Sequence, residues 1–236
     1  MSIWGKFSGA VAGLVTGGPL GALLGALAGH FLVDRDSGDA TIGFTIAVIA
    51  LSAKMAKADG IVTDEEVRAF ERLFRVAPEE AANVRRVFDL ARRDTAGFEA
   101  YAAQIAHLFV GNPGLLEDIL DGLFEIAKAD GVLHPAEAAF LERVAEIFGF
   151  APNEFRRIRA SHFTPDKADP YVVLGVAYDA SEEEIRRTYR RLVRENHPDS
   201  LIGRGVPEEF VRLATDKLAA INGAFDKIEL ERGFKR

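Results

Sequence analysis

Residues 181–199 read SEEEIRRTYRRLVRENHPD, and this stretch decides how the C-terminal part of the chain folds. Ser181 with Glu184 three positions later has the spacing of a capping box, in which a hydroxyl and a carboxylate bond backbone N–H groups at a helix start. The pattern therefore predicts a helix that begins at Ser181. Pro198 has no backbone donor and disfavours helical geometry at His197, so the helix is predicted to end there.

The predicted helix has an apolar face and a cationic face. Residues that suit burial recur at three- and four-residue spacing, at Ile185, Thr188, Tyr189 and Leu192. Arginines occupy the remaining face, at Arg186, Arg187, Arg190, Arg191 and Arg194. A helix of this kind buries one side and presents the other to an anionic surface.

A second amphipathic helix is predicted to begin near Pro207, because proline suits the first helical position and acidic residues follow it. Its apolar positions are Phe210, Leu213, Leu218, Ile221, Phe225 and Ile228. The two helices are expected to pack as an antiparallel hairpin with residues 197–199 at its tip. We expect His197 to lie exposed in that loop, away from helix caps and from the core.

Four elements in this order resemble the J-domain family. They are the run 169–176 (DPYVVLGV), the helix start at Ala180-Ser181, the tripeptide His197-Pro198-Asp199 and the run 221–225 (INGAF). The resemblance implies a DnaK-type ATP-dependent chaperone as partner. It assigns His197, Pro198 and Asp199 to signalling that speeds ATP hydrolysis by the partner, and the five arginines to docking. Ser200 departs from the family, because many members have lysine after the tripeptide.

Charge and cysteine content exclude several classes of function. The chain has 236 residues and a formal net charge of −7, which argues against non-specific nucleic-acid binding. It has no cysteine, and therefore no disulfide, thiolate metal site or cysteine nucleophile. Because no nucleophile and general base form a recognisable constellation, we expect neither enzyme activity nor a cofactor.

Residues 1–33 are predicted to form a transmembrane anchor. From Phe7 to Val33 there is no aspartate, glutamate, lysine or arginine, and this length suffices for a helix to span the hydrocarbon core. Glycine recurs there every fourth residue, at Gly9, Gly13, Gly17, Gly21, Gly25 and Gly29. Such a row lets another helix approach closely, so we expect a homodimer through the anchor. A soluble glycine-rich leader and a cleaved signal peptide are the alternatives.

The J-like part, residues 169–236, decides the expected orientation of the chain in the membrane. Export would separate that part from any ATP-driven chaperone, so we expect a retained single-pass anchor in the cell inner membrane. The remainder of the chain would then lie in the cytoplasm. Lys6 and Arg35 do not decide the orientation, since Asp34 and Asp36 flank Arg35.

Residues 41–163 are predicted to form a helical domain with an internal duplication. The apolar run from Ile42 to Met55 is too short for a comfortable second span and is interpreted as a core helix. The segment 57–62 (KADGIV) returns as 128–133 (KADGVL), and 74–80 (FRVAPEE) returns as 148–154 (FGFAPNE). A further helix is expected between the copies, around 98–110. These duplicated turns resemble the TerB family and suggest a bundle of seven helices.

The acidic turns of the duplication admit two explanations. Asp59 with Glu66, and Asp130 with Glu137, supply the oxygen ligands that calcium or magnesium would need if the copies converged. Alternatively, each Asp-Gly ends one helix and the glutamate caps the next, which accounts for every residue. We favour capping and expect the domain to bind no metal.

The whole chain resembles the DjlA family of membrane-anchored co-chaperones. Polar linkers at 34–40 and 164–168 divide it into the anchor (1–33), the TerB-like domain (41–163) and the J-domain (169–236). The resemblance implies an all-α protein that recruits a DnaK-type chaperone to the membrane and stimulates its ATP hydrolysis, with an unknown client or regulator on the TerB-like domain. The alternatives are a membrane-tethered scaffold whose J-like domain does not signal, and a metal-binding TerB-like stress protein.

Substituting Gly21→Leu or Gly25→Leu is expected to weaken association of the anchor, because close backbone approach requires a hydrogen as side chain. Leu24→Ile keeps the apolar volume and serves as the control. Crosslinking of the full-length protein in membranes measures the effect. Equal crosslinking of the glycine variants and the parent, or recovery of the parent in the soluble fraction, would contradict the prediction.

Overall fold

The computed structural model describes residues 47–55, 97–128, 131–162, 169–204, 206 and 208–234. All regular secondary structure within these ranges is helical, which confirms the predicted all-α class. Outside the described residues lie the predicted anchor, both linkers, and Asp59, Glu66 and Asp130 of the duplicated turns.

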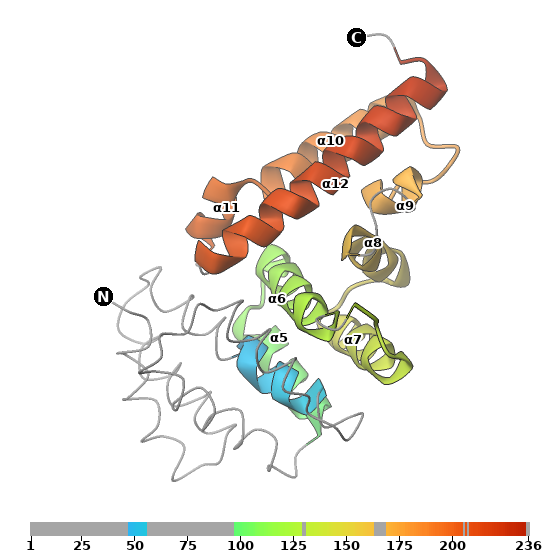
Figure 1. Cartoon of the computed structure of the whole chain (residues 1–236). Helices are drawn as coiled ribbons and strands as arrows, with labels where there is room; N and C mark the ends of the chain where they lie inside the picture. The colour runs from blue at the N-terminus through green and yellow to red at the C-terminus, as the bar shows by residue number, and fades with distance from the viewer. Residues whose placement is uncertain are drawn as a thin grey trace.

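The first lobe is a helical bundle around one apolar core (Figure 1). It contains helical residues 47–55, α5 (Phe98–Leu108), α6 (Pro113–Ala127), α7 (Pro135–Ile147) and α8 (Pro152–His162). Every residue of 47–55 is at most 4% exposed, which confirms the predicted core helix. The helix α6 contributes Ile119, Leu123 and Phe124, each completely buried, and lies between α5 and the second lobe.

Local sequence signals place the ends of these helices. Asn112 accepts a bond from the Leu115 N–H (3.3 Å) at the start of α6. The Glu137 carboxylate accepts the His134 N–H (2.9 Å), and Glu154 accepts the Ala151 N–H (2.8 Å). The predicted capping role of Glu137 is therefore confirmed, since its carboxylate satisfies a backbone donor at the start of α7.

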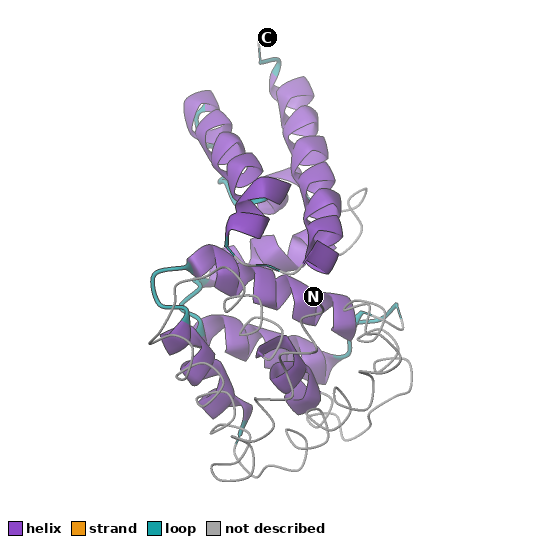
Figure 2. Ribbon diagram, turned by 90° about the vertical axis from the view of Figure 1, so that its left-hand side faces the viewer, coloured by secondary structure: helices purple, strands orange, loops and turns teal. Residues whose placement is uncertain are grey.

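The second lobe contains α9 (Pro170–Leu174), α10 (Glu182–Glu195), α11 (Pro198–Gly203) and α12 (Glu208–Arg232). The Ser181 hydroxyl accepts the Glu184 N–H (3.2 Å), so α10 begins where the sequence predicted. The helices α10 and α12 form the predicted antiparallel hairpin, joined at one end by α11 (Figure 2). Ile185 and Leu192 of α10 meet Ile221 and Phe225 of α12 in its core.

The two lobes share buried surface at the start of α12. Phe210 and Ala214 of α12, with Leu201 of α11, belong to the same buried apolar cluster as α6. Gly122 of α6 permits this approach, because a Cβ there would lie 2.6 Å from Cε1 of Phe210. The hairpin is therefore packed on the bundle as well as linked to it through the chain.

Two glycine-to-alanine substitutions test this packing. Gly223→Ala, on an exposed face of α12 with nothing within 4 Å of the added carbon, is expected to stabilise the protein by about 0.5–1 kcal/mol through helix propensity. Gly122→Ala gains the same propensity but collides with Phe210, and overpacking costs about 1–3 kcal/mol, so net destabilisation is expected. Urea unfolding followed by helical circular dichroism measures both. Stabilisation by Gly122→Ala equal to that by Gly223→Ala would refute the close contact.

Candidate functional site

The tripeptide His197-Pro198-Asp199 begins a short helix instead of forming an irregular loop. His197 is the N-cap of α11, with its Nδ1 accepting the Asp199 N–H at 3.2 Å and Pro198 in the first helical position. The expectation that His197 lies away from helix caps is therefore wrong. Histidine is not among the preferred cap residues, so the cap rules did not find it. The side chains of His197 and Asp199 are 54% and 88% exposed.

Four of the predicted docking arginines, Arg187, Arg190, Arg191 and Arg194, are exposed on α10. Arg191 Nη1 lies 2.6 Å from Glu195 Oε2, one turn further along the helix. An exposed pair of this kind contributes at most about 1 kcal/mol, so the guanidinium stays available to a binding partner. The exposed arginines thus lead along α10 towards the tripeptide.

Arg186 occupies a different place from the other arginines. Its side chain is 28% exposed and bonds Glu182 Oε1 (2.8 Å) and Glu229 Oε1 (3.3 Å). Its guanidinium also lies 5.7 Å from the Phe225 ring centre and 5.4 Å from that of Phe234, within range of a cation–π contact. Arg186 therefore joins α10 to α12, away from the tripeptide.

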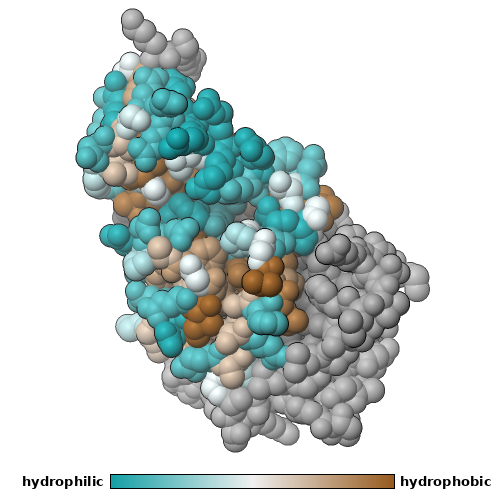
Figure 3. Space-filling view, turned by 180° about the vertical axis from the view of Figure 1, so that it is seen from behind, coloured by the Kyte–Doolittle hydropathy of each residue, from teal (hydrophilic) through white to brown (hydrophobic). Residues whose placement is uncertain are grey.

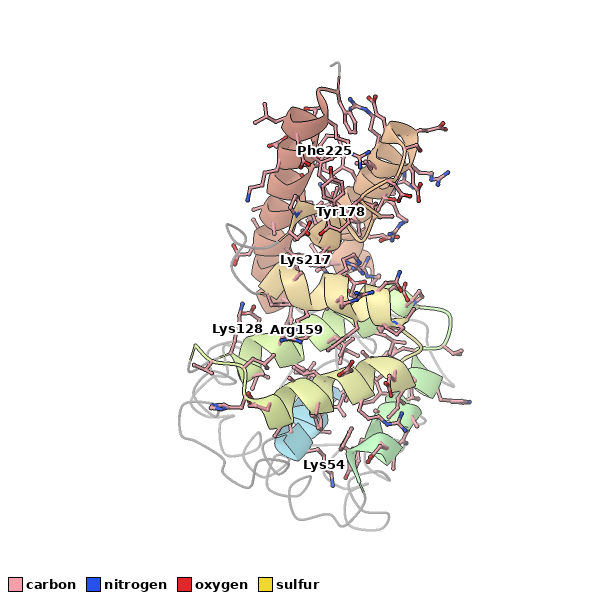
Figure 4. The ribbon with its side chains drawn as sticks, turned by 90° about the vertical axis from the view of Figure 1, so that its right-hand side faces the viewer. Lys54, Lys128, Arg159, Tyr178, Lys217 and Phe225 are labelled. Carbon is pink, nitrogen blue, oxygen red and sulfur yellow. The ribbon has the colours of Figure 1, made fainter. Side chains whose placement is uncertain are left out.

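Four carboxylates on α6, two of them buried and two partly buried, face the second lobe. We call Glu117, Asp118, Asp121 and Glu125 the α6 acidic face. Lys217 of α12 places Nζ 2.5 Å from Glu117 Oε1 and 2.7 Å from Asp121 Oδ2. In Figure 4, Lys217 lies where α12 meets the bundle. The ion pairs therefore connect the two lobes.

Three further basic side chains complete the contact with the α6 acidic face. Arg157 of α8 bonds both carboxylate oxygens of Glu117, at 3.0 and 2.5 Å. His162, the last residue of α8, places Nε2 2.7 Å from Asp121 Oδ1 and Nδ1 3.2 Å from Glu125 Oε1. Arg204, just after α11, bonds Asp118 Oδ2 through Nε (3.1 Å) and Nη2 (2.8 Å).

The pKa values follow from burial and from these partners. Burial alone would raise the pKa of Glu117, but the adjacent Arg157 and Lys217 outweigh it and hold the pKa below the ordinary value. For Asp118 burial prevails over Arg204 and raises the pKa to about 7. Burial lowers the pKa of His162, yet the bonds to Asp121 and Glu125 raise it overall. Both ring nitrogens can donate to these carboxylates when the imidazole is protonated.

Comparison with known proteins agrees with this arrangement of elements. The model of the family described as "Co-chaperone DjlA transmembrane domain" matches residues 1–51, that of "Tellurite resistance protein TerB" matches 45–160, and that of the DnaJ domain matches 169–226. The Co-chaperone protein DjlA of Shewanella oneidensis is 31% identical to this chain over the full length of both. The chain belongs to the DjlA family of co-chaperones.

Two other DjlA proteins support the assignment. That of Photobacterium profundum is 31% identical over 81% of this chain and 79% of its own, and that of Coxiella burnetii is 30% identical over 75% and 73%. No solved structure matches the chain. Like its family, the chain is a membrane-anchored co-chaperone with a TerB domain and a J domain. Within the part of the chain that the structure describes, no helix has both the length and the apolar character needed to cross a membrane.

The contact between the lobes of this DjlA family member does not follow from any pattern local to its sequence. Lys217 falls in the apolar stripe of α12, between Ala214 and Ile221, and a lysine at such a position is a signal of a buried partner. On α6 the carboxylates of Glu117, Asp121 and Glu125 recur four residues apart on one face. Neither pattern identifies its partner, since the paired residues lie about 100 positions apart.

The histidine contact predicts a pH dependence of stability. Since the folded state raises the pKa of His162 above its ordinary value of 6.5, its stabilisation is complete below that value and is lost as the pH rises through the folded pKa. We therefore expect His162→Gln to destabilise by about 1–3 kcal/mol near pH 6, and the difference from the parent to shrink as the pH rises above 6.5 and through the folded pKa.

Urea unfolding midpoints of the parent and of His162→Gln across this pH range measure the effect. The difference between the two proteins removes the contribution of Asp118, which does not bond His162 and is present in both. Asp121 and Glu125 do bond His162, but their pKa values are lowered, so in the parent they titrate below this pH range. If the stability difference between the parent and His162→Gln stays constant from acid to alkaline pH, the protonated His162 imidazole is not held between Asp121 and Glu125.

Proposed function

We propose that this DjlA family member recruits a DnaK-type chaperone to the membrane surface and stimulates its ATP hydrolysis. The observation that carries the proposal is the exposure of His197 and Asp199 at the start of α11, directly after the exposed arginines of α10. His197, Pro198 and Asp199 would signal to the partner, and Arg187, Arg190, Arg191 and Arg194 would dock it.

The surface of the second lobe supports docking by charge. Seen from behind in Figure 3, the lobe formed by α9 to α12 is mostly hydrophilic, whereas apolar atoms gather on the bundle. A row of exposed guanidinium groups attracts an acidic partner over distances comparable with the Debye length and raises the rate of encounter. Arg186 would contribute indirectly, by joining α10 to α12.

The remaining parts of the proposal concern the anchor and the bundle. Residues 1–33 would cross the inner membrane once and associate through the glycine row into a homodimer, leaving 41–163 and 169–236 in the cytoplasm. The TerB-like bundle would bind a client or a regulator. A tethered scaffold without signalling remains the competing function, and ATPase stimulation separates the two.

Substitutions at His197 separate signalling from capping. His197→Gln removes a helix cap, which costs about 0.5–2 kcal/mol, whereas His197→Asn keeps an acceptor suited to the N-cap and should preserve stability. Both are expected to abolish stimulation, because both remove the imidazole. Single-turnover ATP hydrolysis by the cognate DnaK-type chaperone, with the full-length protein added, measures the result. Full stimulation by folded His197→Asn would leave the scaffold function in place of the proposed one.

Charge reversal on α10 should produce a different defect. Relative to the parent, Arg187→Glu or Arg191→Glu is expected to raise the concentration needed for half-maximal stimulation, by a larger factor at low salt than at high salt, because salt screens the attraction that these charges provide. The exposed Arg143 of α7, which pairs with Glu146, provides the control Arg143→Glu. An equal defect in this control, or a defect independent of salt, would argue against docking through α10.

A further inference from the structure

Arg204 joins three elements around the tripeptide. Its guanidinium bonds Asp118 Oδ2 of α6 through Nε (3.1 Å) and Nη2 (2.8 Å), while Nη1 donates to the Glu195 carbonyl (2.9 Å) at the end of α10. Its backbone N–H donates to the carbonyls of Ser200 (3.1 Å) and Leu201 (3.0 Å), and so closes α11. One side chain thus holds the end of α10, the end of α11 and the bundle.

The tripeptide lies at the opposite end of the same short helix. α11 has six residues, begins directly after His197 and ends directly before Arg204, so it spans only about 9 Å. A rigid piece of this length transmits the position of one end to the other. Fixing Arg204 therefore limits how far His197 and Asp199 can move relative to α10.

The ion pair of Arg204 with Asp118 lies within the interface between the two lobes and is largely buried. The side chains of Arg204 and Asp118 are 18% and 7% exposed. A Cβ on Gly114 would lie 3.4 Å from three atoms of the Arg204 side chain, so the α6 glycine leaves room for the guanidinium. Arg204 and Arg191 also line one cleft of about 410 Å³ between the lobes. The docking helix and the bundle thus meet at Arg204.

We infer that Arg204 is a positioning residue, which together with Asp118 uses the TerB-like bundle to hold the His197-Pro198-Asp199 turn in its signalling orientation. The inference rests on the proposed function. It means that the bundle takes part in stimulation through an internal contact, in addition to any client that it binds. Arg204 itself is mostly buried and is not part of the surface that meets the chaperone.

ATPase stimulation as a function of full-length protein concentration tests the inference. Arg204→Gln is expected to lower the maximal stimulation by about three- to tenfold, because small displacements of a functional group are costly in rate. The half-saturating concentration should change by less than about twofold, since the exposed arginines of α10 stay in place. Charge reversal at Arg191 should show the opposite pattern.

A double-substitution cycle tests whether lower stimulation comes from the loss of the Arg204–Asp118 contact or from a loss of folding. Asp118→Asn should reduce maximal stimulation as Arg204→Gln does, and the double variant should be no worse than either, because both remove one shared contact. The double variant also leaves no unpaired buried charge. Arg143→Gln, which removes an exposed ion pair on α7, should stimulate like the parent. Additive defects, or full stimulation by Arg204→Gln, would overturn the inference while leaving the proposed function intact.

A distance measurement provides a readout that does not depend on the chaperone. The chain has no cysteine, so spin labels at Ile202→Cys on α11 and Arg156→Cys on α8 report the turn against the bundle without background. The parent is expected to give a narrow distribution and Arg204→Gln a broad one. A narrow distribution in both would overturn the positioning role, and absence of stimulation by the parent itself would overturn the proposed function and this inference together.

Discussion

The arrangement of the second lobe depends on the neutralisation of the α6 acidic face. Asp118 and Asp121 are buried, and Glu117 is partly buried, on a helix that also supplies the core of the bundle. Arg157, Arg204 and Lys217 bring opposite charges to within hydrogen-bonding distance. These charges hold the pKa values of Glu117 and Asp121 below the ordinary range and offset part of the burial of Asp118, whose pKa stays raised. Two of these three cations belong to the J-domain, so the bundle is completed electrostatically by the domain that follows it.

Buried ion pairs of this kind are better suited to fixing an orientation than to adding stability. Their desolvation offsets most of the attraction, whereas removing one partner costs about 3–5 kcal/mol. The apolar contacts of Phe210, Ala214 and Leu201 with the bundle supply the favourable burial. A shifted docking would keep some of that burial but would separate Glu117 from Lys217 and Asp118 from Arg204. The ion pairs thus select one orientation of the second lobe among those that the apolar contacts alone would allow.

The sequence predicted the features that depend on residues close together in the chain. It missed the contacts between residues that lie far apart in the chain. The start of α10 at Ser181, the cap by Glu137 and the hairpin of α10 with α12 follow from spacings of three and four residues. The tripeptide was recognised from its motif, but its role as the start of α11 was not. Arg186 looked like its exposed neighbours because periodicity does not reveal that Phe225 and Phe234 lie beside it. The pairing of Lys217 with α6 joins residues about 100 positions apart, for which no local rule exists.

The central claim is that the J-domain and the TerB-like bundle form one body. Spin labels at Arg156→Cys on α8 and Leu230→Cys near the end of α12, both exposed positions, measure the distance between the lobes in the full-length protein. Because buried pairs are screened far less than exposed ones, the account predicts a single narrow distance distribution that is unchanged between about 0.1 M and 1 M salt. A broad distribution at either salt concentration would show that the J-domain moves independently on its linker and would contradict the account.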